Sequence, residues 1–498
     1  MKKIILRQWP LLIFLLFYFL IAFFTYKSYG ISIDEPDEYL RGKLLYNKAR
    51  GNDKVLQEDF VIKKQDNQDL LDHNHLHHAL LYVFNGKESF EEYHLLNLIF
   101  ASLIFIAIYE ILLINLRRQS IAILGTIFLF FTPRFTGDIP SNPKDTIFGV
   151  YYFLSLSLIY ISASLKWDEK VKIIVLGVIF GLTQALRVLG YALYPIYFIY
   201  AILTLKMEKK NIIKSLLNLL LEMVLIFFVS YLVHIISLPY LGADPFWHFW
   251  ELIKVSARYG WPGKVLFFGN FVLASKLPWT YLPVWILITT PIFIIILFTV
   301  SLLNFNVKNK LFILFALSLV INFFVFFVTR PTIYDGLRHM IYLVPQIVLM
   351  SIFGLTYLLS KKGFRIAVMI LLLISLLMVA KDYIELHPYQ YIYFNKLAGG
   401  LKNARGKFET DYWGESNIEA AKWIRGNVIK SNLKIYTCGN EAAIIYYLPE
   451  AKAVKNAAEA DYAVCWERMD DYKNIKGRIV HTISRQATPL TYIFKIKE

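Results

Sequence analysis

The sequence predicts a mainly α-helical, polytopic membrane protein, a bundle of about eleven spanning helices followed by a small α/β domain. Composition is the first observation: the 498-residue chain is 57% hydrophobic, with a mean hydropathy of +0.48. Only 18% of its residues are charged, whereas soluble domains average roughly a quarter. The second observation is that the charged residues gather between long apolar runs, and the third is that these runs stop near residue 381.

Eleven apolar segments are long enough, or nearly so, to cross a membrane. A spanning helix needs about 20 mostly apolar residues because the hydrocarbon core is roughly 30 Å thick. The segments lie near 9–26, 95–115, 119–133, 146–165, 172–187, 189–205, 214–238, 283–305, 311–328, 339–360 and 365–380. The third and fifth are short, which suggests a tilted or partly re-entrant path. No small-residue cleavage site follows the first, so we expect an uncleaved anchor.

Basic residues in the short loops predict the orientation. They occur at every second connection, as the positive-inside rule expects of cytoplasmic loops. The clusters are Lys2, Lys3 and Arg7; Arg117 and Arg118; Lys166, Lys170 and Lys172; Lys206, Lys209 and Lys210; Lys308 and Lys310; Lys361, Lys362 and Arg365. We therefore expect a cytoplasmic N-terminus and, after eleven spans, an external C-terminal segment. The same positions explain the net charge of +16 without a nucleic-acid partner.

The chain divides into a membrane module, residues 1–380, and an extracytoplasmic α/β domain, residues 381–498. Periodicity in the second part predicts a helix at Ser416–Val428, a strand at Leu433–Thr437, a short helix at Asn440–Tyr447, and strands at Asp461–Trp466, Arg478–Ser484 and Leu490–Lys495. The domain has no phosphate-binding glycine fingerprint and no catalytic triad, so we expect acceptor binding or a lid. Its cysteines, Cys438 and Cys465, fit either one bridge or two buried thiols.

The first long loop opens with Ile33-Asp34-Glu35-Pro36-Asp37-Glu38-Tyr39. Four carboxylates in five positions are costly at an apolar boundary unless they are hydrated, paired or used. One interpretation is a hydrated loop start. The other is a general base beside a second carboxylate, where a membrane-borne substrate arrives. On the second interpretation Asp34 and Glu35 are candidate catalytic residues and Asp37 is a candidate substrate contact.

The same loop contains the histidine-rich stretch Asp72-His73-Asn74-His75-Leu76-His77-His78. If it is helical, His73 and His77 share one face, as do His75 and His78. Imidazole is a common metal ligand, so a divalent metal is possible. The alternative, which the residues favour, is a polar interfacial helix whose histidines contact headgroups or phosphate, with His77 and His78 as candidate substrate contacts.

A short connector between two spans, Phe131–Asp145, holds Arg134, Asp138, Lys144 and Asp145. Asp145 lies at the expected start of a helix, where free N–H groups and the helix dipole favour an anion. A salt-bridged cap therefore accounts for Asp145, which is also a candidate substrate contact. It does not explain why Arg134, Asp138 and Lys144 share so short a connector.

Two further arginines lie at the edges of apolar runs, Arg187 and Arg338, the second followed by His339. An arginine at membrane depth is expensive and marks a functional site unless it snorkels to the headgroups. A basic lining on the outer face would comprise Arg134, Lys144, Arg187, Arg330 and Arg338, beside His339. Guanidinium groups suit a lipid phosphate because they bind it bidentately.

These patches resemble the GT-C superfamily of polyprenyl-phosphate-sugar-dependent glycosyltransferases. The similarity is greatest to the protein O-mannosyltransferase family (family 39), which includes the aminoarabinose transferases of lipid A. The matching residues are the pair Asp34-Glu35, the segment Pro133–Asp138 with Asn142–Asp145, and the stretch His387–Asn395 leading to Phe408–Gly414. The last stretch resembles bacterial members with an external C-terminal domain. The likeness covers most of the chain in topology and only these patches in residues.

The resemblance implies a GT-C-like fold and a sugar transfer with inversion from a polyprenyl-phosphate donor. Asp34 would take the proton of the acceptor hydroxyl, Glu35 would orient it or contact the acceptor, and Asp138 would be the second loop carboxylate. Some of Lys144, Arg187 and Arg338 would stabilise the departing lipid phosphate. The acceptor is a lipid, a glycan or a protein, in or beside the inner (plasma) membrane. The chain departs from the family at His73–His78, where other members have a shorter, often proline-bearing motif.

Two other classes fit part of the pattern. A lipid or solute transporter, or a flippase, would explain the many spans and the charges near them. However, the polar residues concentrate on one side and no internal repeat is visible. A non-catalytic membrane scaffold would use the acids as structural caps.

Overall fold

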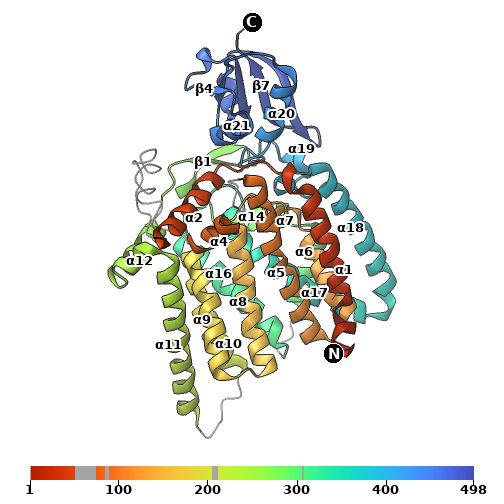
Figure 1. Ribbon diagram of the computed structural model, residues 1–498. Coiled ribbons are helices and arrows are strands. Elements are labelled where there is room, and N and C mark those ends of the chain that lie inside the picture. The colour runs from red at the N-terminus through yellow and green to blue at the C-terminus, as the bar shows by residue number, and fades with distance from the viewer. Residues whose placement is uncertain are drawn as a thin grey trace.

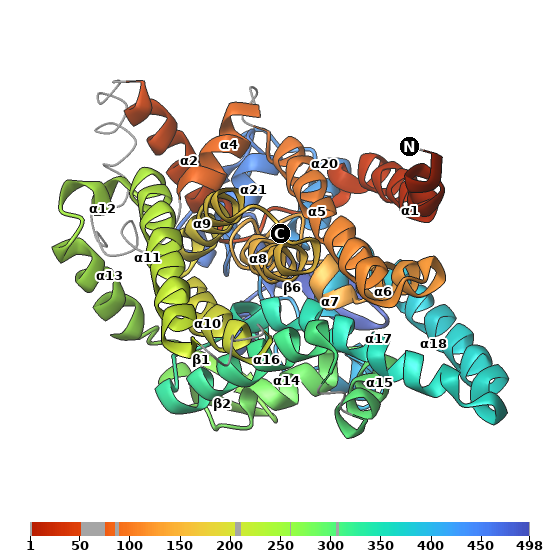
Figure 2. The same ribbon diagram turned by 90° about the horizontal axis from the view of Figure 1, so that it is seen from below.

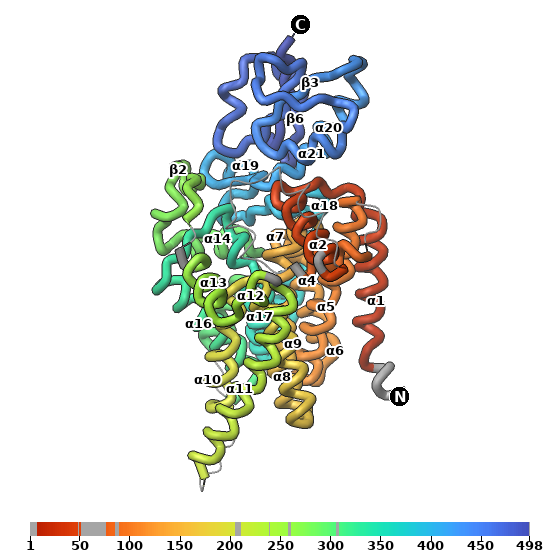
Figure 3. Tube along the Cα trace, turned by 60° about the vertical axis from the view of Figure 1, so that its left-hand side comes forward, coloured from red at the N-terminus to blue at the C-terminus, as the bar shows by residue number. Residues whose placement is uncertain are grey.

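The computed structural model describes residues 2–50, 75–84, 89–204, 211–258, 260–304 and 308–497. It shows a helical bundle with a small sheet domain at one end (Figure 1). The N-terminus lies at the opposite end of the bundle, and the C-terminus lies at the far tip of the sheet domain (Figures 1 and 3). We call the end of the bundle beside the sheet domain the domain end.

Seven helical stretches of the described residues are long and apolar enough to cross a membrane. They comprise α1 (Lys2–Thr25), α5 (Phe90–Leu116), α8 (Asp145–Leu165), α11 (Ile212–Ser237), α16 (Lys310–Thr329), the 3₁₀ turn η5 (Arg338–Leu343) with α17 (Val344–Ser360), and α18 (Arg365–Leu386). The chain is therefore a multi-pass membrane protein built mainly of helices, as predicted.

The other four predicted spans also fall on helices, but three differ from the prediction. α6 (Gln119–Phe130) is short, as expected, with 12 residues. The fifth span, α9 (Glu169–Leu186), has 18 residues, and it is the sixth, α10 (Leu193–Thr204), that has only 12. The prediction that residues 283–305 form one continuous helix is wrong.

This eighth segment is broken into α14 (Tyr281–Thr289) and α15 (Ile292–Leu303), which meet at 119°. Thr290 is extended, with φ −92° and ψ 138°, and Pro291 follows it. Proline lacks an N–H and disfavours helical backbone in the preceding residue, so the helix ends there.

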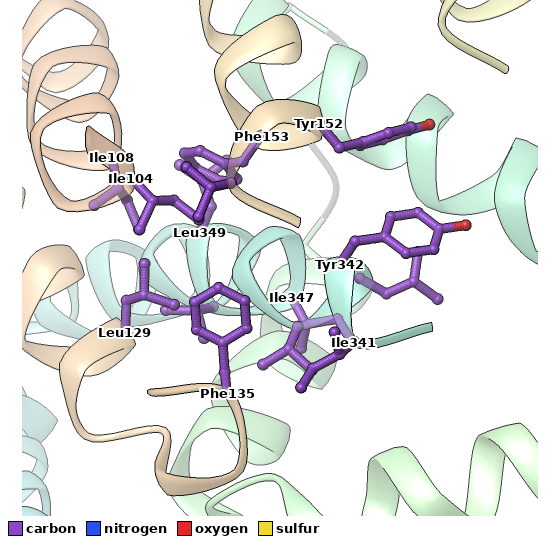
Figure 4. Packing of buried hydrophobic residues seen from close by; sticks show 14 of the residues in the cluster. Ile104, Ile108, Leu129, Phe135, Tyr152, Phe153, Ile341, Tyr342, Ile347 and Leu349 are labelled. Atoms are coloured by element: carbon purple, nitrogen blue, oxygen red, sulfur yellow. The ribbon is translucent and has the colours of Figure 1, made fainter. Parts of the chain in front are cut away.

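α8 and α17 form the centre of the bundle, while α1, α11 and α18 lie at its periphery (Figure 2). In the apolar windows of α8 and η5–α17, 78% of residues are buried, against 11% in α18. Buried side chains from α5, α6, α7 (Pro133–Thr136), α8 and α17 meet in the core, among them Ile104, Leu129, Phe135, Phe153 and Leu349 (Figure 4). Peripheral helices therefore present apolar surface outward, as a lipid environment requires.

α15 and α17 pack closely through a glycine. A Cβ built on Gly354 of α17 would lie 1.9 Å from the carbonyl oxygen of Leu297 in α15. Small residues allow two membrane helices to approach this closely.

The sheet domain holds five strands in the order β4-β3-β5-β7-β6. The strands are β3 (Lys434–Thr437), β4 (Lys452–Ala453), β5 (Tyr462–Trp466), β6 (Arg478–Arg485) and β7 (Thr488–Lys495), with helices α20 (Asn417–Asn427) and α21 (Glu441–Tyr447). β3 pairs in parallel with β4 and β5, whereas β7 pairs antiparallel with β5 and β6. All the predicted strands and helices of this domain are present. β4 and the hairpin of β1 (Lys264–Phe267) and β2 (Asn270–Leu273) were not predicted.

Cys438 and Cys465 form a disulfide, with their Cα atoms 4.7 Å apart. The bond joins the loop after β3 to the neighbouring strand β5. Of the two alternatives that the sequence left open, the structure has the bridge.

Several short elements lie toward the domain end of the bundle or, like the two between α11 and β1, at its side (Figures 1 and 3). They are α2 (Glu35–Ala49), α4 (His75–Phe84), α12 (Pro239–Ala243), α13 (Trp247–Arg258), the 3₁₀ turn η7 (Gln390–Ile392) and α19 (Gly400–Ala404). α18 continues to Leu386, beyond the domain boundary expected at residue 380. The segment after it is buried, including Tyr389, Tyr391 and Tyr412, so it connects the two parts as a packed layer.

We expect Gly354→Ala to lower the unfolding midpoint of the protein in detergent. The added methyl would overlap the Leu297 carbonyl, and overpacking of this kind costs about 1–3 kcal/mol. Thermal unfolding followed by tryptophan fluorescence measures it. The matched control is Gly363→Ala, where a Cβ would meet nothing within 4 Å. Equal midpoints for both variants would contradict the close packing of α15 on α17.

Candidate functional site

Arg338 brings three carboxylates together at the domain end of the bundle. Its Nε donates to Asp145 Oδ2 at 2.8 Å, its Nη1 to Asp335 Oδ2 at 3.0 Å, and its Nη2 to Asp34 Oδ2. The carboxylates come from the start of α8, the loop after α16 and the loop before α2. The Arg338 guanidinium also lies over the Trp413 ring, 4.2 Å from its centroid. One side chain therefore joins four segments that are distant in sequence.

Only one acid among the partners of Arg338 is open to solvent. The Asp34 side chain is 36% exposed, whereas Asp145 is 1% exposed and Asp335 is 2% exposed. Arg338 itself is 4% exposed. The cluster therefore presents a single carboxylate, Asp34, to an incoming molecule, and a buried cation fixes its orientation.

Asp145 is the buried centre of a second set of contacts. Its Oδ1 accepts a hydrogen bond from Arg187 Nη1 at the end of α9, and its backbone N–H donates to Asn142 Oδ1 at 2.9 Å. With Arg338 on Oδ2, both carboxylate oxygens are occupied. This is the salt-bridged cap that the connector sequence suggested.

Asp138 is fully buried behind Trp413. Trp413 Nε1 donates to its Oδ1 at 3.0 Å, and Asn142 Nδ2 and Thr146 Oγ1 donate to its Oδ2 at 2.7 and 3.2 Å. Burial raises the pKa of Asp138 to about 6, although these donors oppose the rise. Asp138 therefore fixes the indole that lies against Arg338.

Arg134 is 1% exposed and lies in an aromatic cage. Its Cζ is 5.1 Å from the Trp285 ring centroid and 5.4 Å from those of Phe394 and Tyr412. Nη1 donates to the Tyr391 carbonyl. These contacts tie the connector before α8 to the layer beneath the sheet domain.

Glu35 and Glu38 lie behind Asp34 on the buried side of α2. Glu35 Oε2 accepts from the Ser32 amide at 2.8 Å, and His94 Nε2 lies 2.9 Å from Oε1. Burial raises the pKa of Glu35, and His94 opposes the rise. The two carboxylate oxygens of Glu35 therefore join the loop that carries Asp34 to His94 of α5.

Glu38 lies in a more positive environment. His78 Nε2 is 2.9 Å from its Oε2, Arg41 Nε is 3.7 Å away, and Lys144 Nζ is 3.7 Å from Oε1. Burial acts to raise the pKa of Glu38, but these three groups outweigh it and hold the pKa well below its usual range. Lys144 thereby reaches from the connector to α2 and remains 14% exposed.

The histidines of α4 contact neighbouring tyrosines. His77 Nδ1 lies 3.5 Å from Tyr151 Oη, and His78 Nδ1 lies 3.0 Å from Tyr93 Oη. No group of three His, Cys, Asp or Glu side chains suited to a metal occurs among the described residues. His73 lies outside the described residues.

The remaining predicted site residues lie nearby. His339 packs edge-on against Tyr334, with ring centroids 4.4 Å apart, and is 9% exposed. Asp37 is half-buried on α2. Arg330 is exposed at the end of α16, with φ 45°.

Three further residues belong to the site and were not identified as such from the sequence. Asp335 and Trp413 contact Arg338, and Arg468 of the sheet domain donates from Nη2 to Asp335 Oδ1. Asp335 is three residues from Arg338, a spacing that already suggests a pair. Trp413 lies in a patch that the family resemblance selected. Arg468 had no local signal because its partner is 133 residues earlier in the chain.

A cavity of about 500 Å³ lies beside Arg468, and we call it the hairpin cavity. Its lining comes from the β1–β2 hairpin, α19 with the residues after it, and the turn after β5. It comprises Leu266, Gly269, Phe271, Lys402, Arg405, Gly406, Phe408, Glu409, Thr410, Asp411, Glu467, Arg468, Met469, Asp470, Tyr472 and Lys473.

Glu409, in the lining of this cavity, is 6% exposed. Arg468 Nε lies 3.8 Å from its Oε1, longer than a hydrogen bond. Burial raises the pKa of Glu409 to about 8, with Arg468 opposing the rise and Asp335 adding to it. Glu409 is therefore largely a neutral acid at pH 7.

Of three comparisons with known proteins, only the comparison with solved structures finds a match. No protein-family model matches the sequence, and neither does any curated protein. Among solved structures, the crystal structure of ArnT from Cupriavidus metallidurans in the apo state is similar, with a TM-score of 0.53 and 11% identity. The match covers 100% of this chain and 98% of that chain. The match shows the fold alone: a mainly helical membrane bundle arranged like that of ArnT.

We expect Glu409→Gln to flatten the pH dependence of stability. The folded state keeps the Glu409 proton up to a pH of about 8, whereas an unfolded glutamate releases it near its ordinary value of 4.5. This contribution to stability is complete below pH 4.5 and is lost as pH rises to 8, by up to about 1.4 kcal/mol per pH unit. Unfolding midpoints between pH 5 and 9 measure it. The control is Glu450→Gln, an exposed glutamate paired with Arg425. Parallel curves for wild type and Glu409→Gln would contradict the raised pKa.

Proposed function

We propose that the protein is a membrane glycosyltransferase that moves a sugar from a polyprenyl-phosphate donor to an acceptor hydroxyl, with inversion at the sugar carbon. The observation that carries the proposal is Asp34, a solvent-open carboxylate held by the buried Arg338. The ArnT-like fold supports this class of reaction.

Asp34 has the accessibility and orientation that a general base needs. A hydroxyl is too weak an acid to lose its proton beforehand, so the base accepts the proton while the new bond forms. The acceptor oxygen attacks the sugar carbon from the face opposite the phosphate. The carbon–oxygen bond to the phosphate breaks, its electron pair leaves with the phosphate, and the proton passes to Asp34. Glu35 and Asp138 then act as positioning residues, through Ser32 and Trp413.

The departing phosphate gains negative charge and needs preplaced cations. Lys144 and Arg187 suit this role because their side chains are 14% and 19% exposed and both lie beside the Arg338 cluster. Arg338 and Arg134 are too enclosed to contact a phosphate, so we assign them to positioning. His339, beside Tyr334, is a further candidate for the phosphate. Asp37 is a candidate acceptor contact, whereas His77 and His78 support α4.

We also propose that the domain end faces the outer side of the inner (plasma) membrane. The basic connections Arg117-Arg118 and Lys166–Lys172 follow α5 and α8, whose other ends carry His94 and Asp145 of the site. α8 alone spans about 30 Å from Asp145, so the basic loops lie on the opposite side. The Cys438–Cys465 bridge fits an oxidising space around the sheet domain.

We expect Asp34→Asn to lower sugar transfer by a factor of about 10²–10⁴, because the amide cannot accept the hydroxyl proton. Release of polyprenyl phosphate from radiolabelled polyprenyl-phosphate sugars by the purified protein measures it, with EDTA in a separate arm to test for a metal. The control is Asp168→Asn, at the exposed cap of α9, where asparagine caps equally well. Full activity in a correctly inserted Asp34→Asn protein would overturn the assignment. If donors are translocated and none is consumed, the protein is a transporter.

We expect Arg338→Lys to lower the turnover at least tenfold and to lower the unfolding midpoint. Lysine keeps the charge, but a single ammonium cannot reproduce the three directed bonds to Asp34, Asp145 and Asp335. The matched control is Arg365→Lys, an exposed arginine at the start of α18. The assignment of Arg338 to positioning fails if both variants transfer sugar at the wild-type rate.

A further inference from the structure

The hairpin cavity is large enough for a ligand and polar enough to select one. Its volume of about 500 Å³ is within the range of small-molecule sites. Four basic and four acidic side chains contribute to the lining: Lys402, Arg405, Arg468 and Lys473, and Glu409, Asp411, Glu467 and Asp470. Equal numbers of the two signs do not favour a polyanion.

Three of the four acids already have partners within the protein. Asp411 Oδ1 accepts from Tyr391 Oη and from the Gly414 amide. Glu467 Oε1 accepts from Arg405 Nε at 2.6 Å. Asp470 Oδ2 accepts from Lys473 Nζ at 2.7 Å.

Glu409 is the exception. Neither carboxyl oxygen makes a hydrogen bond with a described residue, although both are buried. The Arg468 guanidinium and the Leu266 amide provide only weaker attraction. A buried polar group that lacks a well-formed hydrogen bond costs up to roughly 1–3 kcal/mol, so a ligand that donated one to Glu409 would gain part of that in affinity.

An aromatic ring completes the lining. Phe271 of β2 lines the cavity and is 41% exposed. Hydrogen-bonding side chains of both signs beside an exposed aromatic face match a saccharide, which offers hydroxyls as donors and acceptors and an apolar face of C–H groups. A lipid tail would require an apolar lining.

Arg468 connects the cavity to the Asp34 cluster. It lines the cavity, donates to Asp335 Oδ1, and donates from Nη1 to the Tyr412 carbonyl at 3.0 Å. Asp335 in turn binds Arg338, which binds Asp34. A ligand in the cavity therefore lies two ion pairs from Arg338, the residue that orients Asp34.

We propose that the hairpin cavity binds the saccharide part of the acceptor at a distance from the reacting hydroxyl, and that Arg468 is the positioning residue that connects this subsite to Arg338 and Asp34. The acceptor is then a glycan or a glycolipid. The identification of this saccharide as part of the acceptor rests on the proposed function. Saccharide binding in the cavity does not depend on it.

The test is saccharide binding to the full-length protein in nanodiscs without donor, by saturation-transfer-difference NMR. The probes are the methyl glycosides of glucose, mannose, galactose and N-acetylglucosamine. We expect at least one to bind wild type and Asp34→Asn equally, and to bind at least tenfold more weakly to Glu409→Gln, Arg405→Ala and Lys402→Ala. Lys402 is exposed, so its variant does not risk the fold. The control is Arg425→Ala, which removes an equivalent exposed Arg–Glu pair elsewhere in the domain.

Kinetics separate the subsite from the reaction. Arg405→Ala is expected to raise the acceptor KM at least tenfold with kcat within twofold, while Arg468→Lys lowers kcat as well because it loosens Asp335. The inference is overturned if wild type binds none of the four glycosides, if the cavity variants bind them like wild type, or if short-chain phosphatidylglycerol displaces them. If wild type binds a glycoside at the cavity but transfers no sugar from any donor, the proposed function fails and the saccharide site stands.

Discussion

The buried guanidinium of Arg338 is the interaction on which the domain end of this protein depends. Around it the charges balance: Arg187, Arg338 and Arg468 face Asp34, Asp145 and Asp335. Removing one partner from a buried ion pair typically costs about 3–5 kcal/mol, because the remaining charge has no compensation. The ion pairs therefore hold the loops that carry these residues in one arrangement, because moving any loop would leave a buried charge unpaired.

The same arrangement separates the charged side chains into enclosed ones and solvent-accessible ones. Buried acids use their oxygens on neighbouring groups, as Asp138 does with Trp413 and Glu35 with Ser32, while Asp34 keeps access to solvent. The same division separates the cations, since Lys144 and Arg187 remain partly accessible and Arg134 is enclosed by aromatic rings. On the proposed function, a site built this way is rigid before the substrate arrives, which is the condition for electrostatic stabilisation.

Much of the fold could be predicted from the sequence because it follows from local rules. Apolar length identified the spans, and alternation identified strands such as Tyr462–Trp466. The break at Thr290-Pro291 was overlooked because the apolar run continues through it, although the proline was visible. β4 has only two residues and makes no pattern of its own.

The candidate site was harder to predict, since its contacts join distant segments. Asp34, Asp145, Arg187 and Arg338 were selected singly, for charge at a membrane boundary, and the structure places them in one cluster. The same reasoning selected Arg134 and His77, which lie in other environments. Hydropathy and charge indicate which residues are unusual. They do not indicate which of them meet, because that depends on how the helices pack.

The contact between Arg468 and Asp335 has a consequence for biogenesis. Because synthesis runs from the N-terminus, the chain that carries Asp34, Asp145, Asp335 and Arg338 leaves the ribosome before Arg468 does. Until the last strands fold, Asp335 has one counter-charge in place of two. A nascent or prematurely terminated chain therefore carries an electrostatically incomplete cluster, and completion of the sheet domain acts as the final step of maturation.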